Sequence, residues 1–109
     1  MQFIVIGRDG KDADALARRM AARAAHIALG DKLVASGNLL MGVALLDGEG
    51  KMCGSVLLCD FASREALDGW LREEPYVTGQ VWKETEVVEC RVGPSFQNIL
   101  EKITASSLS

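Results

Sequence analysis

The feature that most constrains the fold is one long segment without a helix breaker. From Ala13 to Ser36 the chain contains no proline and is rich in alanine, so the sequence predicts a long helix there. At 3.6 residues per turn, one stripe of this helix is apolar, as is typical of a face that packs on a core. The stripe comprises Leu16, Met20, Ala24, Ile27 and Val34. Asp12 is placed to cap the start of the helix, and Gly37-Asn38 to end it.

Short apolar segments before and after this helix predict strands, because they are rich in β-branched residues and bounded by turn residues. Their ranges are residues 3–6, 39–46, 55–61 and 81–92. The turn sequence Asp-Gly-Glu-Gly at 47–50 joins the second and third strands as a hairpin. Ser63 is placed to cap a short second helix whose apolar face is formed by Leu67, Trp70 and Leu71. Pro75 is expected to end that helix.

The order strand, helix, strand, strand, helix, strand predicts an α+β, ferredoxin-like βαββαβ fold, with both helices on one face of a four-stranded antiparallel sheet. The other face must meet water, a ligand or another protein. Two apolar sets alternate along the second and third strands: Val43, Leu45, Val56 and Leu58 against Leu40, Ala44, Leu46, Leu57 and Cys59. We therefore expect both faces to be buried, which predicts a homodimer packed sheet to sheet.

The length of 109 residues predicts one domain, which we place at residues 1–98, followed by a partly flexible C-terminal extension at 99–109. A net charge of −3 argues against nucleic acid as a partner. The N-terminal apolar stretch is too short for a secretory signal or a membrane helix, so we expect a cytoplasmic protein that binds no membrane. The cysteines, Cys53, Cys59 and Cys90, form no CxxC pair and are interpreted as core residues of a reducing compartment.

The single histidine, His26, is the first candidate for chemistry, because imidazole is the usual side chain for proton transfer near neutral pH. It lies about 120° from the apolar stripe, on a flank shared with Arg19, Arg23, Gly30 and Leu33. Gly30 leaves open space one turn further on, which fits the wall of a cleft. The alternative is a half-buried histidine with no task.

A carboxylate is needed to orient such an imidazole, and Glu74 is our choice over its neighbour Glu73. The pair can equally be a solvated helix end, and Asp31, Asp47 and Asp60 are weaker candidates. Of the clustered aromatic residues Trp70, Tyr76 and Trp82, the tryptophans are expected to serve packing and Tyr76 to line the cleft. The spacing of the residues predicts neither a metal site nor a phosphate-binding loop, and no cofactor is expected.

Several segments together resemble a known family. They are Arg23–Ile27 around the histidine, Gly37–Leu40, Phe61–Ala66, and Glu73–Val77 leading into Gln80–Trp82. Over about residues 1–92 the chain resembles the YciI-like (YCII-related) family of the dimeric α/β-barrel superfamily. The resemblance differs at two places: Glu74 stands where aspartate is usual, and Met41-Gly42-Val43 stands where a Gly-Pro pair is common.

The resemblance implies a ferredoxin-like protomer that dimerises through its sheet and forms a cleft holding a His–acid pair. It also implies lyase-type elimination from hydroxylated aromatic compounds. Our first hypothesis is therefore a cofactor-independent enzyme in which His26 and Glu74 move a proton on a small molecule, either a hydroxylated aromatic or a lactone-like compound, by elimination or isomerisation. Tyr76, Arg23 and Gly30 would contact this ligand. The alternatives are a non-catalytic dimer that binds a small molecule as an accessory protein, and a purely structural dimer.

Overall fold

The computed structural model describes residues 1–98, in which the elements follow the predicted order. They are β1 (Gln2–Asp9), α1 (Ala15–Ser36), β2 (Leu39–Leu46), β3 (Met52–Asp60), α2 (Arg64–Leu71), α3 (Pro75–Thr78), β4 (Trp82–Cys90) and a short 3₁₀ turn at Pro94–Phe96. The extension predicted at 99–109 lies outside the described residues. Within residues 1–98, no helix is both long and apolar enough to cross a membrane.

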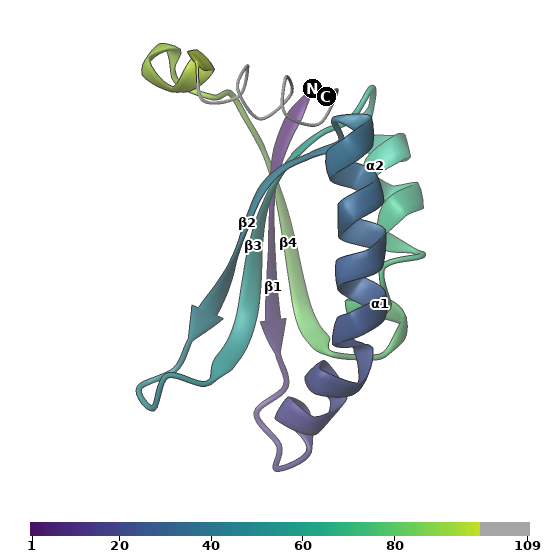
Figure 1. Ribbon diagram of the computed structural model, residues 1–109, viewed down its shortest axis with the longest axis vertical. Helices are drawn as coiled ribbons and strands as arrows, with labels where there is room; N and C mark the ends of the chain where they lie inside the picture. Colours follow the sequence, from purple (N-terminus) through teal and green to yellow (C-terminus); the bar gives the residue numbers. More distant parts are fainter. Residues whose placement is uncertain (99–109) are drawn as a thin grey trace.

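The four strands form one antiparallel sheet in the order β2-β3-β1-β4. The long helix α1 and the shorter α2 lie on the same side of this sheet, and the opposite side is left uncovered (Figure 1). This arrangement is the predicted α+β, ferredoxin-like fold. β1 is central, with Ile4 paired to Leu58 of β3 on one side and to Val88 of β4 on the other.

The core lies between the sheet and the helices. Its buried residues are Phe3, Val5, Leu57, Cys59, Phe61, Leu67, Trp70, Tyr76, Val81 and Trp82. The apolar face predicted for α2 is confirmed, because Leu67 and Trp70 are buried there and Leu71 packs against the same cluster. The Ser63 hydroxyl caps α2 by accepting a hydrogen bond from the backbone N–H of Ala66 at 3.1 Å.

The start of α1 differs from the prediction. The helix begins at Ala15 after the N-cap residue Asp14, whose side chain makes no capping hydrogen bond. Asp12 is not the cap, because Arg18 engages both of its carboxylate oxygens at 2.7 and 2.8 Å. This contact holds the pKa of Asp12 well below its usual range. The predicted end is confirmed, since Gly37 has a left-handed conformation with φ of 84°.

The apolar stripe predicted to pack on the core is instead exposed in this chain. Leu16, Met20, Ala24, Ile27 and Val34 are all exposed, and Ile27 and Val34 border an open cavity between α1 and the sheet. The inner side carries Ala15, Arg19, Ala22, His26, Leu29 and Leu33. The helical period was right and the choice of flank was wrong, because small and ion-paired residues occupy the side that meets the rest of the molecule.

Other boundaries also shift. β1 continues past Gly7 to Asp9, and a Cβ at Gly7 would lie 2.2 Å from the Trp82 ring. β3 begins earlier, at Met52, and α3 starts at the proline that was expected only to end a helix.

The expectation of a buried Cys53 is wrong, because this residue is exposed near the hairpin. Cys59 is buried, and burial raises the pKa of its thiol to about 12.

The uncovered side of the sheet is mainly apolar at its centre. Ile4, Ile6, Val56 and Leu58 are only half-buried in the single chain, while Met41, Val43 and Val88 beside them are exposed. The strand register puts these residues on the face opposite the core, since they alternate with the buried residues of β1 and β3.

Candidate functional site

A cavity of about 290 Å³ lies between α1 and the sheet. Its walls come from α1, from β2 and β3, and from Tyr76 of α3; the α1 wall includes Arg19, Arg23, His26 and Gly30. A Cβ at Gly30 would meet only the Leu39 side chain, at 3.8 Å, so the helix leaves open space beside the histidine. The volume is just below the usual range of about 300–1,000 Å³ for ligand pockets, which favours a small molecule.

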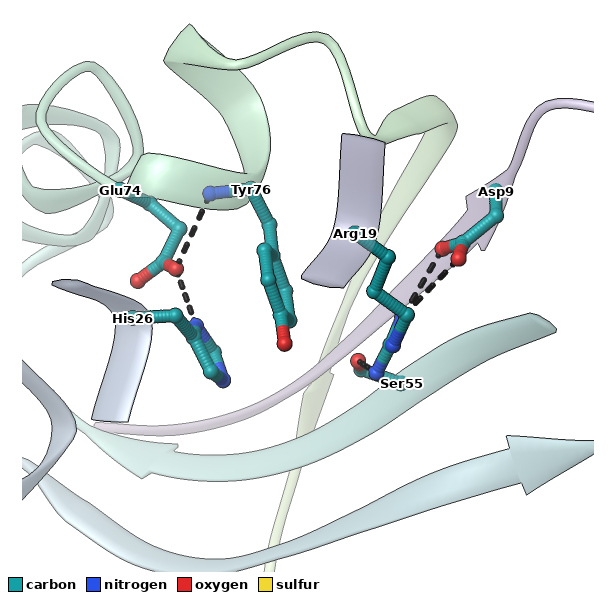
Figure 2. A network of polar contacts seen from close by, with 6 residues as sticks. All are labelled: Asp9, Arg19, His26, Ser55, Glu74 and Tyr76. Carbon is teal, nitrogen blue, oxygen red and sulfur yellow. Dashed lines mark hydrogen bonds and ion pairs between the residues drawn. The ribbon is translucent and has the colours of Figure 1, made fainter. Parts of the chain in front are cut away.

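His26 is held by a buried carboxylate. Its Nδ1 forms a hydrogen bond with Oε1 of Glu74, whose side chain is 1% exposed, while the histidine side chain is 19% exposed. An ionised carboxylate can only accept, so Nδ1 carries a proton and donates it to this bond. In the neutral imidazole Nε2 is therefore an acceptor, and Figure 2 shows it pointing away from Glu74.

Glu74 is fixed by the short helix that it begins. It is the N-cap residue of α3, and its Oε1 accepts a hydrogen bond from the backbone N–H of Tyr76 at 3.3 Å. Pro75 occupies the first position of that helix, where its missing N–H is not needed. The local sequence Glu-Pro-Tyr, which follows the predicted second helix, therefore positions both the carboxylate of Glu74 and the ring of Tyr76.

Aromatic contacts fix the plane of the imidazole. The rings of His26 and Tyr76 stack with centroids 3.8 Å apart and an angle of 11° between them. Trp82 meets both rings edge-on, at 6.3 Å from His26 and 5.7 Å from Tyr76. The imidazole is thus restricted by its carboxylate partner and by two aromatic neighbours.

A second polar group lies beyond the tyrosine. The Arg19 guanidinium lies 4.6 Å from the centre of the Tyr76 ring, on the side away from His26 (Figure 2). It donates to Asp9 at 2.9 and 3.2 Å and to the Ser55 hydroxyl at 2.8 Å. Burial raises the pKa of Asp9, although the arginine opposes this shift. The cation therefore holds one wall of the cavity in place.

All five residues predicted for the site lie at one place. His26, Tyr76, Arg23 and Gly30 line the cavity, and Glu74 lies behind His26. Their roles in binding or catalysis remain predictions. The weaker acidic candidates are dispersed: Asp31 lines the cavity, Asp47 accepts hydrogen bonds in the hairpin, Asp60 pairs with the N-terminal amine, and Glu73 is exposed. Among residues 1–98, no group of three or more His, Cys, Asp or Glu side chains is placed to hold a metal ion.

Sequence reasoning missed the polar group around Arg19. It placed Arg19 on the correct flank of the helix but gave it no role, and it did not consider Asp9 or Ser55. One signal was available for Ser55, because it alternates with Leu57 and Cys59 on the inner face of β3. Asp9 similarly ends the inner set of β1 that begins with Phe3 and Val5.

Comparison with known proteins identifies the family of the chain. The YCII-related domain matches residues 1–91 of the chain. The proteins YciI of Escherichia coli and of Shigella flexneri are each 30% identical to it over 93 residues, which cover 80% of this chain and 93% of theirs.

Solved structures show the same fold. A 5-chloro-2-hydroxyhydroquinone dehydrochlorinase from Burkholderia phenoliruptrix, in complex with 2,5-dihydroxybenzoquinone, superposes with a TM-score of 0.76 at 21% identity, covering 87% of this chain and 98% of that one. A dimeric ferredoxin-like protein of unknown function from Jannaschia superposes with a TM-score of 0.53 at 16% identity, covering 84% and 98%. The YCII-related domain matches most of this chain, which shows that the chain belongs to the YCII-related family.

Proposed function

We propose that this protein is a cofactor-independent, lyase-type enzyme that removes a proton from a small ring compound. The observation that carries the proposal is the His26–Glu74 pair, in which a buried carboxylate occupies Nδ1 and the other side of the imidazole reaches a cavity. A general base needs this combination of a free acceptor nitrogen and a fixed orientation.

In the proposed reaction the hydroxylated ring reacts as its keto tautomer, and Nε2 of neutral His26 accepts a proton from a saturated ring carbon next to a carbonyl group. The electron pair of the broken C–H bond forms a new double bond, and a group on the adjacent carbon departs with its own bonding pair. Glu74 stabilises the imidazolium formed in this step, because the two groups lie together in a poorly hydrated site. The imidazolium then returns its proton to water or to the departing group.

The substrate class is supported by the shape of the site and by the fold. His26 and Tyr76 stack on each other and both line a cavity of about 290 Å³, a volume that favours a small molecule. The dehydrochlorinase of similar fold acts, by its name, on a chlorinated hydroxyhydroquinone. We therefore propose a small hydroxylated aromatic compound as substrate.

We also propose that the protein forms a homodimer through the uncovered face of its sheet. The support is the apolar centre of that face, together with the Jannaschia protein, a ferredoxin-like neighbour described as dimeric. The cysteines are free thiols, which is consistent with the reducing cytoplasm that we propose as its location.

The test is turnover of 5-chloro-2-hydroxyhydroquinone and its bromo and unhalogenated analogues, followed by halide release and by quinone absorbance. His26→Asn removes Nε2 and is expected to lower kcat about 10²- to 10⁴-fold. Glu74→Gln keeps the size of the side chain but removes the charge, and should also lower kcat. Glu73→Gln, which makes the same change at the exposed neighbour of Glu74 outside the cavity, is the matched control.

Full activity of the His26→Asn variant would contradict the proposed base. Saturable binding of these rings by the wild-type protein, with no halide released and no proton exchanged into deuterated water, would favour a non-catalytic binding protein.

A further inference from the structure

The Tyr76 hydroxyl is a polar group with no evident structural task. The residue is 1% exposed and its ring is fixed between His26 and Arg19. Within residues 1–98, its backbone N–H donates to Glu74, whereas its hydroxyl takes part in none of the side-chain hydrogen bonds. The hydroxyl oxygen is not one of the fully buried atoms that lack a partner, so it is open to the cavity that the residue lines. Tyr76 lines the cavity, and Figure 2 shows the hydroxyl pointing to the same side as Nε2 of His26. A hydroxyl that faces a cavity and forms no hydrogen bond with the protein is available to a ligand.

Positive charge lies close to this hydroxyl. The Arg23 guanidinium lines the same cavity and forms no ion pair with any residue from 1 to 98, whereas Arg19 is engaged by Asp9 and Ser55. Both arginines act to lower the pKa of Tyr76, but burial raises it further than they lower it. The phenol thus remains a proton carrier at neutral pH. The nearby negative groups are Asp9, Glu74 and Asp31, of which the first two are already paired.

We propose that the Tyr76 hydroxyl and the Arg23 guanidinium form an oxyanion subsite beside His26, so that the substrate is a molecule whose reacting carbon is saturated and lies next to a carbonyl group, as in the keto tautomer of a ring phenol. This inference rests on the proposed function, because the subsite has a chemical purpose only if His26 removes a proton. It adds the residue that receives the resulting negative charge.

The chemistry of this step is balanced without a further reactant. When Nε2 takes the proton from the saturated carbon, the electron pair of the C–H bond forms a carbon–carbon double bond, and the π pair of the neighbouring carbonyl moves onto its oxygen to give an enolate. The Tyr76 hydroxyl donates a hydrogen bond to that oxygen and keeps its own proton. The electron pair then returns to form the new double bond as the leaving group departs. The parallel rings of His26 and Tyr76 are 3.8 Å apart, so one small ring can reach both.

Donors aimed at a developing oxyanion are among the largest contributions to catalysis, and removal of one typically lowers kcat about 10²- to 10³-fold. Tyr76→Phe is the informative change, because it keeps the ring that stacks on His26 and deletes only the unpartnered hydroxyl. Its melting temperature should match that of the wild type, since the only hydrogen bond of Tyr76 to a side chain within residues 1–98 is made by its backbone N–H, which the variant keeps.

The subsite can be tested without a known substrate by using 4-nitrophenol, whose phenol and phenolate forms absorb at different wavelengths. The wild-type protein is expected to bind the phenolate in preference, which lowers the apparent pKa of the bound dye. Tyr76→Phe should weaken phenolate binding about 10- to 100-fold, as expected for a hydrogen bond to a charged group. Arg23→Gln should also reduce the preference. Arg72→Gln, which removes the same charge outside the cavity, is the control.

His26→Asn separates the two proposals. It should abolish turnover of the hydroxyhydroquinones and retain the preference for the phenolate. If Tyr76→Phe keeps that preference, or if the wild type shows none or fails to bind the dye at millimolar concentration, the oxyanion subsite is wrong while the base can still be correct. If His26→Asn retains turnover and Tyr76→Phe loses the phenolate preference, the base is wrong and the anion site stands. A loss of the preference in His26→Asn as large as in Tyr76→Phe would place the anion on the imidazole and overturn the subsite.

Discussion

Removing one member of the buried Asp9–Arg19 pair should destabilise the protein far more than removing both. The side chains of both residues are 3% exposed, so neither charge can be stabilised by water if its partner is lost. Breaking such a pair typically costs about 3–5 kcal/mol. Asp9→Val leaves the guanidinium with only the Ser55 hydroxyl and the Tyr76 ring, and Arg19→Met leaves the carboxylate alone.

The double variant Asp9→Val/Arg19→Met removes both charges and fills much of their volume with apolar groups. The main loss of stability that remains comes from the Ser55 hydroxyl, which no longer receives a hydrogen bond from Arg19. This loss lowers the free energy of unfolding by about 1–3 kcal/mol. The two single changes therefore sum to about 6–10 kcal/mol, and the double change should fall short of that sum by more than about 2 kcal/mol.

The assay is urea unfolding at 25 °C, followed by the fluorescence of the two tryptophans, for the wild type, both single variants and the double variant. Arg19→Met has an additional signature. The folded state would then bind a proton at Asp9 more readily than the unfolded chain does, so the deficit should shrink as the pH is lowered toward 4. Additive losses, with the double variant as unstable as the sum of the singles, would refute the reasoning.

Three further changes test other parts of the structure. Gly7→Ala puts a Cβ 2.2 Å from the Trp82 ring and should lower the free energy of unfolding by about 1–3 kcal/mol in the same urea assay; an unchanged value would mean that the ring moves freely. The chain has one tyrosine, so ultraviolet titration reports Tyr76 alone: it should ionise above its ordinary value of 10.0 in the folded protein, and stability should fall as the pH rises past that value, because the unfolded chain ionises first. Val43→Asp changes a residue 52% exposed in the single chain and should convert a dimer to monomers in light scattering, whereas an unchanged mass would contradict the proposed interface.

Much of the fold could be predicted because it depends on local signals. The order of segments, the Gly37 helix end and the Ser63 cap all follow from residues near one another in the sequence. The start of α3 was missed for a physical reason: proline disfavours the residue before it in a helix but is tolerated at a helix's own first position. With Glu74 as cap, Pro75 therefore ends one helix and begins another.

The inner face of α1 could not be chosen from its own residues. Hydrophobicity favoured the flank with Leu16 and Met20, whereas the buried flank contains an arginine whose partner, Asp9, belongs to a different element. The contact between His26 and Glu74 spans 48 positions in the sequence, so only the acid–proline–aromatic pattern and the family resemblance indicated it. Ser55 and Asp9 became visible as parts of the site only when the strands were placed beside the helix.

One oxygen of Glu74 serves two partners, the backbone of α3 and the imidazole on α1. The length of this side chain therefore acts as a spacer that sets how far apart two helices stand. The family resemblance leads one to expect an aspartate here, whose side chain is shorter by one methylene. Its carboxylate oxygen could hydrogen bond either to the backbone N–H of Tyr76 or to the imidazole of His26. It could form both hydrogen bonds only if the two helices moved closer together. In this protein the gap between α1 and α3 is thus matched to a glutamate.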